Sequence, residues 1–274
     1  ALPADAFMTL SFNPAALSEK SNAGAFADSE LFARINEELA GVESLSAEQK
    51  EYYLSLLKNP AETGVDMDRD SYMFFTLEGE NPAQPTGRGG LLLPLADRAK
   101  FDAFIAQVNA VSGLEVEQSG TISYVRVGEQ SDVSVVCAFN EAACMLFVSQ
   151  ENPEECLSRV KDLFAQKTDK SLIGNRAIAE RLAGKNDINV VLSYAALMPM
   201  LKSNPMVVAM PAMEALGGVS LLGSMNFEKG RIVVDGAMAF ADDAAKAKLE
   251  ELYGYVEPQT GKLLRYLPAQ SIAA

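Results

Sequence analysis

Two short segments far apart in the chain share one order of elements, and this repeat restricts the fold more than any other feature. Residues 8–19 read MTLSFNPAALSE, and residues 190–201 read VVLSYAALMPML. In each, an apolar segment typical of a strand leads through Leu-Ser-aromatic into the Ala-Ala-Leu of a short helix. Internal similarity of this kind indicates a unit of structure that the chain uses twice.

A second pair of segments extends the repeat. Residues 89–105 (GGLLLPLADRAKFDAFI) and 235–252 (DGAMAFADDAAKAKLEEL) each place a strand before Ala-Asp and a helix. The order strand, helices, strand, strand, helix then occurs twice, by internal duplication. It predicts an α+β fold, a mainly antiparallel sheet with helices packed on it. We expect a first module over 1–168, with an inserted double hairpin, and a second over 169–274. Because Leu-Pro-Ala at 267–269 repeats residues 2–4, we expect the chain to end in the start of a further unit.

Single elements follow from local signals. Residues 6–12 are expected to form the first strand, and residues 71–79 a strand rich in aromatic side chains. Asp97 and Asn152 are expected to cap helices, and residues 218–227 and 231–240 predict a hairpin with a three-residue loop in which Gly230 is left-handed. The Pro and Gly content of residues 81–90 (NPAQPTGRGG) predicts a turn or a flexible loop before a strand at 90–96. No Lys-Ser/Thr follows these glycines, so they do not form a phosphate loop.

Composition excludes several function classes. The chain has 274 residues, no histidine, no tryptophan and a formal net charge of −14. Without histidine, a Ser-His or Cys-His nucleophile and a His-ligated metal are impossible. The negative charge disfavours binding of nucleic acid, because it repels the phosphate backbone. The longest apolar stretches are also far shorter than the roughly 20 residues of a membrane-spanning helix.

Three cysteines, Cys137, Cys144 and Cys156, occur without a metal-binding spacing. If Asn140-Glu141 is a two-residue hairpin loop, Cys137 lies directly opposite Cys144 on the neighbouring strand. A disulfide between them is one alternative, but directly opposed cysteines rarely reach disulfide geometry, so two buried free thiols are favoured. Cys156 lies on the apolar side of the helix expected after Asn152 and is expected to be packed and inert.

Three segments resemble an uncharacterised family of Bacteroidetes lipoproteins, known as a domain of unknown function. They are residues 2–21 (LPADAFMTLSFNPAALSEKS), 57–75 (LKNPAETGVDMDRDSYMFF) and 186–199 (NDINVVLSYAALMP). The resemblance spans essentially the whole chain. It implies an exported protein of the periplasm or cell surface, held to the membrane only by an N-terminal lipid anchor, with no established activity.

Acidic residues at alternate positions, Asp66, Asp68 and Asp70, form a candidate calcium site. Oxygen ligands spaced in this way converge on one ion in calcium-binding loops. However, Ser71 stands where such a loop has glycine, and Leu77 where it has a bidentate glutamate. A solvated acidic turn before a strand is the alternative, and we expect no cofactor.

A methionine-rich segment, MPMLKSNPMVVAMPAM at 198–213, is a candidate ligand-binding region. It contains Met198, Met200, Met206, Met210 and Met213, of which the last three share one helical face. Thioether sulfurs bind Cu(I), but no histidine or cysteine lies nearby. Methionine also fills cores and lines adaptable apolar grooves, which is the favoured interpretation.

Three functions remain open at this stage. The first is a non-catalytic envelope domain that binds or assembles with another envelope protein. The second is a carrier of a lipid or other apolar ligand in a methionine-lined groove, which requires an apolar cavity of several hundred Å³. The third is a histidine-free hydrolase, which requires two converging carboxylates with raised pKa values. The absence of histidine and the repeated sheet and helix units favour a protein that is not an enzyme.

Overall fold

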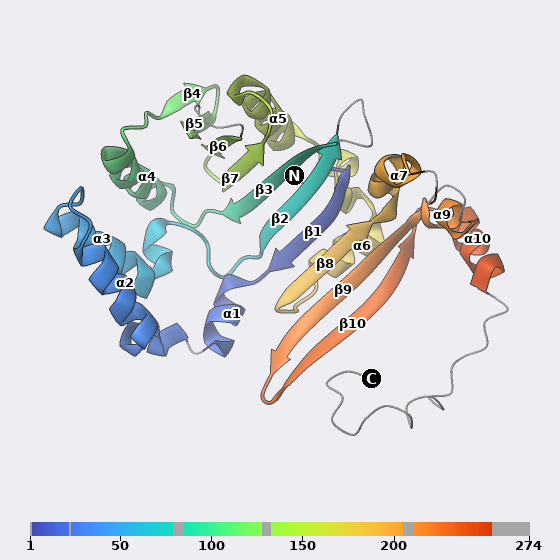
Figure 1. The fold of residues 1–274 in the computed structure, drawn as a ribbon, viewed down its shortest axis with the longest axis horizontal. Coiled ribbons are helices and arrows are strands. Elements are labelled where there is room, and N and C mark those ends of the chain that lie inside the picture. The colour runs from blue at the N-terminus through green and yellow to red at the C-terminus, as the bar shows by residue number, and fades with distance from the viewer. Residues whose placement is uncertain are drawn as a thin grey trace.

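A computed structural model describes residues 2–21, 23–78, 85–127, 133–204, 206 and 211–253, and Figure 1 shows its fold. The strands are β1 (Ala6–Phe12), β2 (Ser71–Glu78), β3 (Thr86–Pro94), β4 (Glu117–Ser119), β5 (Ile122–Val127), β6 (Ser134–Phe139), β7 (Ala143–Ser149), β8 (Ile188–Ser193), β9 (Val219–Glu228) and β10 (Arg231–Phe240). The α-helices are α1 (Pro14–Lys20), α2 (Glu30–Ala40), α3 (Ala47–Lys58), α4 (Arg98–Ser112), α5 (Pro153–Ala165), α6 (Arg176–Leu182), α7 (Tyr194–Lys202), α9 (Pro211–Leu216) and α10 (Asp243–Tyr253). Short 3₁₀ turns are η1 (Ala23–Asp28), η2 (Pro60–Thr63), η3 (Thr168–Lys170) and η4 (Leu172–Gly174).

The described strands form one antiparallel sheet in the order β10-β9-β8-β1-β2-β3-β7-β6-β5-β4. The N-terminal strand β1 lies inside it, paired on one side with β2 and on the other with β8. The predicted α+β fold, with helices packed on an antiparallel sheet, is therefore confirmed. The expected boundary at 168/169 lies just after α5, and β1 and β8, on either side of it in the sequence, are joined in the sheet.

The order strand, helices, strand, strand, helix does occur twice, as β1 to α4 and as β8 to α10. Moreover, β1-β2-β3 and β8-β9-β10 extend from the β1–β8 pair in opposite directions. An internal duplication is not confirmed by this arrangement and stays a prediction. The expected further unit at 267–269 lies outside the described residues.

The two faces of the sheet carry different helices. We call the face bearing Thr9, Phe74 and Val191 the covered face. There Phe74 and Phe147 share a core with Leu157 and Val160 of α5 and with Ile178 and Leu182 of α6. We call the opposite face, bearing Met8, Phe75 and Leu192, the open face. On it α4 packs Phe101 and Ile105 against Phe139 and Cys144, and α7, α9 and α10 pack near Val219 and Phe240.

Helix starts follow the capping signals of the sequence. Asn152 accepts a hydrogen bond from the Glu155 amide, and Pro153 takes the first position of α5. Asp97 accepts from the Lys100 amide at the start of α4. Both expected caps are confirmed, because these side chains satisfy amide groups that have no partner inside the helix.

A buried polar network fastens α1 to the β8–β9 side of the sheet. The carboxylate of Asp187 is almost fully buried and accepts from Lys20 Nζ at 2.7 Å and from the Phe227 amide at 2.6 Å. On the covered face, Asn189 donates to Ser11 Oγ at 3.1 Å, and Ser11 donates to the Leu182 carbonyl at 2.9 Å. The network therefore links strands and helices that are distant in the sequence.

Two expected hairpin loops differ from the structure by one residue. Asn140 Oδ1 accepts from the Ala142 and Ala143 amides, so the turn begins at Asn140. Phe139 then pairs with Cys144, and Cys137 pairs with Leu146. The two cysteines are diagonal neighbours with free thiols, their sulfurs 3.7 Å apart.

The loop before β10 has two residues because Glu228 pairs with Arg231, and Gly230 has the expected positive φ of 79°.

Residues 86–90 are a larger correction, because TGRGG was predicted to be part of a loop. It is instead the first half of β3, paired with β2 on one side and, from Arg88 onward, with β7 on the other. The hydrogen bonds and packing of two flanking strands outweigh the weak strand preference of glycine. The strand ends at Pro94, which has no amide group to donate to a neighbouring strand.

Candidate functional site

The candidate site is built on the first half of β3, where side chains alternate between the two faces of the sheet. Gly87, Gly89 and Leu91 lie on the open face, in register with Leu77, Phe75 and Met73 of β2. Arg88 and Gly90 lie on the covered face, in register with Thr76 and Phe74. One strand therefore contributes to two different cavities on opposite faces.

The first cavity is an apolar hollow of about 650 Å³ on the open face. Its position over β2, β3 and β7 follows from cross-strand pairing, since Gly89 lies between Phe75 and Val148 and Leu91 lies between Met73 and Leu146. Apolar side chains that line it are Phe7, Met73, Phe75, Leu91, Leu146 and Val148. Leu146 is 37% exposed, which is unusual for a large apolar residue in the middle of a sheet.

The glycines of β3 are not equivalent. A Cβ at Gly90 would overlap the ring of Phe74, so packing on the covered face requires glycine there. A Cβ at Gly89 would touch the Phe75 ring at an ordinary 3.5 Å, and a Cβ at Gly87 would meet no atom within 4 Å. Glycine inside a strand costs about 0.5–1 kcal/mol relative to alanine. At positions 87 and 89, the fold itself therefore gives no reason for glycine, and the missing side chains leave the hollow open.

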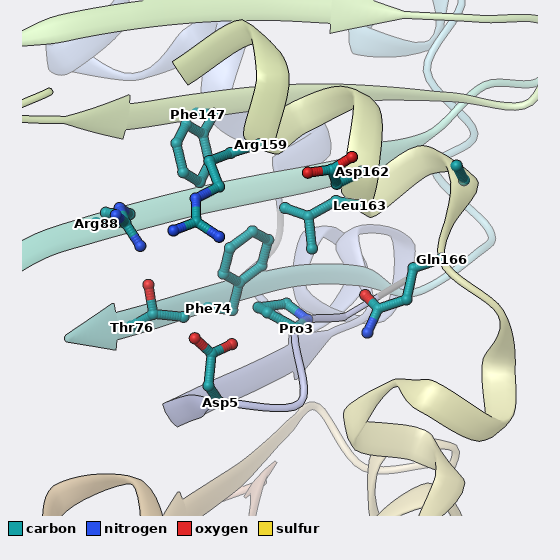
Figure 2. A pocket seen from close by; sticks show the side chains of 11 residues that line it. Pro3, Asp5, Phe74, Thr76, Arg88, Phe147, Arg159, Asp162, Leu163 and Gln166 are labelled. Carbon is teal, nitrogen blue, oxygen red and sulfur yellow. The ribbon is translucent and has the colours of Figure 1, made fainter. Parts of the chain in front are cut away.

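The second cavity, shown in Figure 2, lies on the covered face and measures about 340 Å³. Phe74 and Phe147 form part of its wall, with ring centroids 6.5 Å apart. Gln166, just beyond α5, also lines it; Nε2 donates to the Lys170 carbonyl at 2.6 Å, while Oε1 is buried without a hydrogen-bond partner. This cavity is more polar than the hollow, since Asp5, Arg88, Arg159, Asp162 and Gln166 line it.

Arg88 is the buried charge of this second cavity. Its guanidinium forms ion pairs with Glu78 and Glu151, and Nε donates to Glu151 Oε2 at 2.8 Å. Glu78 also accepts from Arg159 at 2.6 and 2.8 Å. Burial acts to raise the pKa of Glu151, but the hydrogen bonds and charge of Arg88 prevail and lower that pKa. The carboxylates thus neutralise Arg88 internally, which makes it a structural cation.

The candidate calcium residues form a turn that leads into β2. Asp66 Oδ1 accepts from the Asp68 amide at 3.1 Å, and Asp70 Oδ1 accepts from Asn13 Nδ2 at 3.1 Å. Among the residues that the structure describes, no group of three or more His, Cys, Asp or Glu side chains is arranged to hold a metal ion. Calcium binding by Asp66, Asp68 and Asp70 stays a prediction.

The candidate methionines have different environments. Met198 is buried in α7, Met200 and Met213 are half-buried, and Met206 is 81% exposed. Met210 lies outside the described residues. A cavity of about 460 Å³ near α7 and α9 is lined by Tyr194, Leu216, Leu221, Met238, Leu249 and Glu250, none of which belongs to the predicted set. Ligand binding by the predicted methionines stays a prediction.

The sequence could have indicated the hollow by one signal. Glycines at alternate positions 87 and 89, followed by Leu-Leu-Leu, fit a strand with one face stripped of side chains. Their position beside Phe75 and Val148 depends on pairing with strands before and after β3, which periodicity alone does not specify.

Within the described part of the chain, no helix combines the length and apolar character needed to cross a membrane.

No functionally curated protein matches the sequence. One solved structure, described as "Structure of crystal form I of TP0453", is similar with a TM-score of 0.38 and 11% identity, over 94% of this chain and 89% of that one. The family described as "Domain of unknown function (DUF4836)" matches residues 1–274. The chain therefore belongs to this DUF4836 family.

Proposed function

We propose that this chain is a non-catalytic binding domain that takes a small apolar ligand, such as a single acyl chain, into the hollow on the open face. The observation that carries the proposal is the room left above Gly87 and Gly89, which no packing in the described structure requires. A glycine inside a strand often marks the place where a ligand approaches the backbone closely.

The size and the chemistry of the hollow support the same function. Ligand sites have volumes of about 300–1,000 Å³ and mostly apolar walls. The hollow has about 650 Å³, and the side chains of Phe7, Phe75 and Leu146 contribute to its wall. Burying apolar ligand surface there would contribute roughly 25 cal/mol per Å². The proposed ligand class agrees with the carrier hypothesis, but the site lies on β2, β3 and β7 instead of the methionine-rich segment.

Export to the periplasm or cell surface and anchoring by an N-terminal lipid belong to the same proposal. They are supported by the resemblance of residues 2–21, 57–75 and 186–199 to envelope lipoproteins. An exported binding domain would meet lipids, detached acyl chains and envelope proteins as its partners. Fractionation of cells that produce the full protein, with labelling by a radioactive fatty acid, tests this part separately.

A hydrolase is not proposed. Glu117 and Glu151 are carboxyl groups with a resolved pKa shift, and both pKa values are lowered. Hydrogen bonds from Arg126 and Tyr124 lower that of Glu117, and Arg88 lowers that of Glu151 against burial. A general acid requires a raised pKa, so neither group favours this function.

The proposed function is tested by titration with the neutral fluorescent probe N-phenyl-1-naphthylamine and by its displacement with palmitate. We expect Gly87→Leu and Gly89→Val to weaken probe binding at least about tenfold, because their side chains fill the hollow. Gly236→Leu is the matched control: Gly236 is also an exposed strand glycine on the open face with no atom within 4 Å of a Cβ, but lies on β10. Probe binding that is absent, or unchanged in both filled variants, would overturn the proposal.

A further inference from the structure

Among the strands that the structure describes, none pairs with the outer edge of the outermost strand β10. It spans ten residues, Arg231–Phe240, and pairs only with β9 among the described strands. The opposite edge of the sheet is the three-residue strand β4, which offers little backbone for pairing. A long unpaired edge presents a row of amide and carbonyl groups that can pair with another strand.

The side chains of β10 do not protect this edge. Its sequence, RIVVDGAMAF, contains no proline and no lysine, the residues that most often block edge pairing. Ile232, Val234 and Met238 are large apolar residues with 60%, 68% and 52% of their surface exposed. Exposed apolar surface on a free strand edge indicates a protein interaction site.

The charges of β10 are self-complementary in one register. If a second copy pairs antiparallel to it around Val233, Arg231 of each copy lies opposite Asp235 of the other, and Ile232 lies opposite Val234. Opposite charges in such cross-strand pairs stabilise a sheet, and like charges destabilise it. A register centred on Asp235 would instead place two aspartates against each other. Of these two registers, the charge pattern therefore favours the one centred on Val233, and it is compatible with a second copy as the partner.

Arg231 and Asp235 can each form a second ion pair in addition to the one that each has within the chain. Arg231 already bonds Glu228 at 2.6 Å and Asp235 bonds Arg181 at 2.9 Å. Even so, the side chains of Arg231 and Asp235 remain 71% and 66% exposed. Both face the same side of the sheet, since residues 231, 233 and 235 alternate with Ile232 and Val234.

We propose that the chain forms a two-fold symmetric homodimer by antiparallel pairing of β10 with β10 of a second copy, centred on Val233. The dimer joins two sheets edge to edge and covers part of the exposed apolar surface of Ile232 and Val234. The contact is isologous, so one interface uses the Arg231–Asp235 complementarity twice.

Sedimentation equilibrium over a wide range of protein concentration tests the dimer. We expect the wild type to dimerise and Arg231→Asp and Asp235→Arg each to weaken dimerisation at least about tenfold, since each reversal replaces two attractions with two repulsions. Arg34→Asp, a charge reversal at an exposed residue of α2, is the control and should dimerise like the wild type. Circular dichroism establishes that each variant is folded.

Mixing the two single variants gives the sharpest test. The aspartate introduced at position 231 of the first variant would face the arginine introduced at position 235 of the second. The unchanged Asp235 of the first would face the unchanged Arg231 of the second, so both pairs become attractive. We expect a heterodimer in the mixture and a restored homodimer in the double variant Arg231→Asp/Asp235→Arg.

Four results of the sedimentation and mixing experiments would overturn the proposed dimer. They are a wild type that is monomeric at every concentration, a dimer that neither reversal weakens, a mixture without heterodimer, and a double variant that remains monomeric. Hydrogen exchange that shows the β10 edge protected in a monomer identifies another segment as the occupant and also overturns the proposal.

Discussion

Gly90 lies directly beneath the ring of Phe74 on the neighbouring strand, and this contact joins the sheet to the core under α5. Phe74 is 1% exposed, and its ring centroid lies 6.5 Å from that of Phe147, which pairs with Gly90 from the other side of β3. Because a Cβ at position 90 would overlap the ring, the ring position depends on this glycine.

We expect Gly90→Ala to lower the free energy of unfolding by about 1–3 kcal/mol, the usual cost of overpacking a core. Gly89→Ala is the matched control, since its Cβ reaches only ordinary contact with Phe75 and alanine reduces the entropy of the unfolded chain. Urea denaturation of both variants measures the difference. Equal losses in the two variants would contradict the assignment of different roles to these glycines.

The Arg88–Glu151 ion pair predicts a pH-dependent contribution to stability. Burial raises the pKa of Glu151, but Arg88 outweighs it, so the folded-state pKa lies below its ordinary value of 4.5. The stabilisation is therefore complete above the unfolded-state pKa and is lost as pH falls through the folded-state pKa. We expect Glu151→Gln to be less stable than the wild type at pH 7 and this difference to shrink as the pH falls below 4.5 toward the folded-state pKa.

Urea denaturation across that pH range measures the Glu151 contribution. Arg126 and Glu154 form an ion pair in which the Glu154 side chain is 75% exposed, and Glu154→Gln is the control whose difference from the wild type should be small throughout. A Glu151→Gln difference that is independent of pH would contradict the prediction.

Lys20 is expected to stabilise the fold through Asp187. The Asp187 side chain is 3% exposed, so Lys20→Met removes one of its few donors inside the protein. Leaving a buried acceptor without its partner costs about 1–3 kcal/mol. Lys100→Met is the control, because Lys100 and Glu62 are both about half exposed and such pairs contribute about 0–1 kcal/mol. A loss for Lys20→Met no larger than that for Lys100→Met would show that the network does not stabilise the fold.

The three thiols are expected to differ in reactivity. Hydrogen bonding with Cys137, together with burial, raises the pKa of Cys144 well above its usual value, and burial raises the pKa of Cys156. The same hydrogen bond lowers the pKa of Cys137, which is half-buried. Because the thiolate is the reactive form, Cys137 should react first with Ellman's reagent in the native protein.

The three Cys→Ser variants, compared in native buffer and in denaturant, assign each kinetic phase to one thiol. All three thiols of the chain should react rapidly once the protein is unfolded. A native protein in which Cys156 reacts as fast as Cys137 would contradict the burial that the structure gives to Cys156.

The elements that the sequence specified correctly are those with a local physical cause. The period-two pattern of β1, the cap at Asp97 and the Asn152-Pro153 start of α5 each depend on neighbouring residues alone. Residues 86–90 of β3, for which the sequence predicts a loop, do not have such a local cause. There glycine indicates a turn locally, whereas the pairing with β2 and β7 is decided by residues elsewhere in the chain.

The candidate site was less predictable for the same reason. Helical spacing places Met206 and Met213 on one helical face, but spacing does not determine how exposed a side chain is. In the structure, Met206 is exposed and Met198 is buried. The hollow depends on Phe75, Gly89 and Val148, one from each of three strands. A one-residue difference in the turn at Asn140 was also enough to move Cys137 from opposite Cys144 to a diagonal position. Register of this kind is fixed by turn geometry, which composition does not determine.

The position of β1 inside the sheet has a consequence for how the chain reaches its native state. Met8 pairs with Leu192, so β1 keeps one side unpaired during synthesis until β8 has been made. Contacts between such distant residues require a large loop to close before they contribute, and this slows folding. We therefore expect slow refolding from urea, and chaperones that shield exposed strands would act on this protein mainly in the interval between the synthesis of β1 and that of β8.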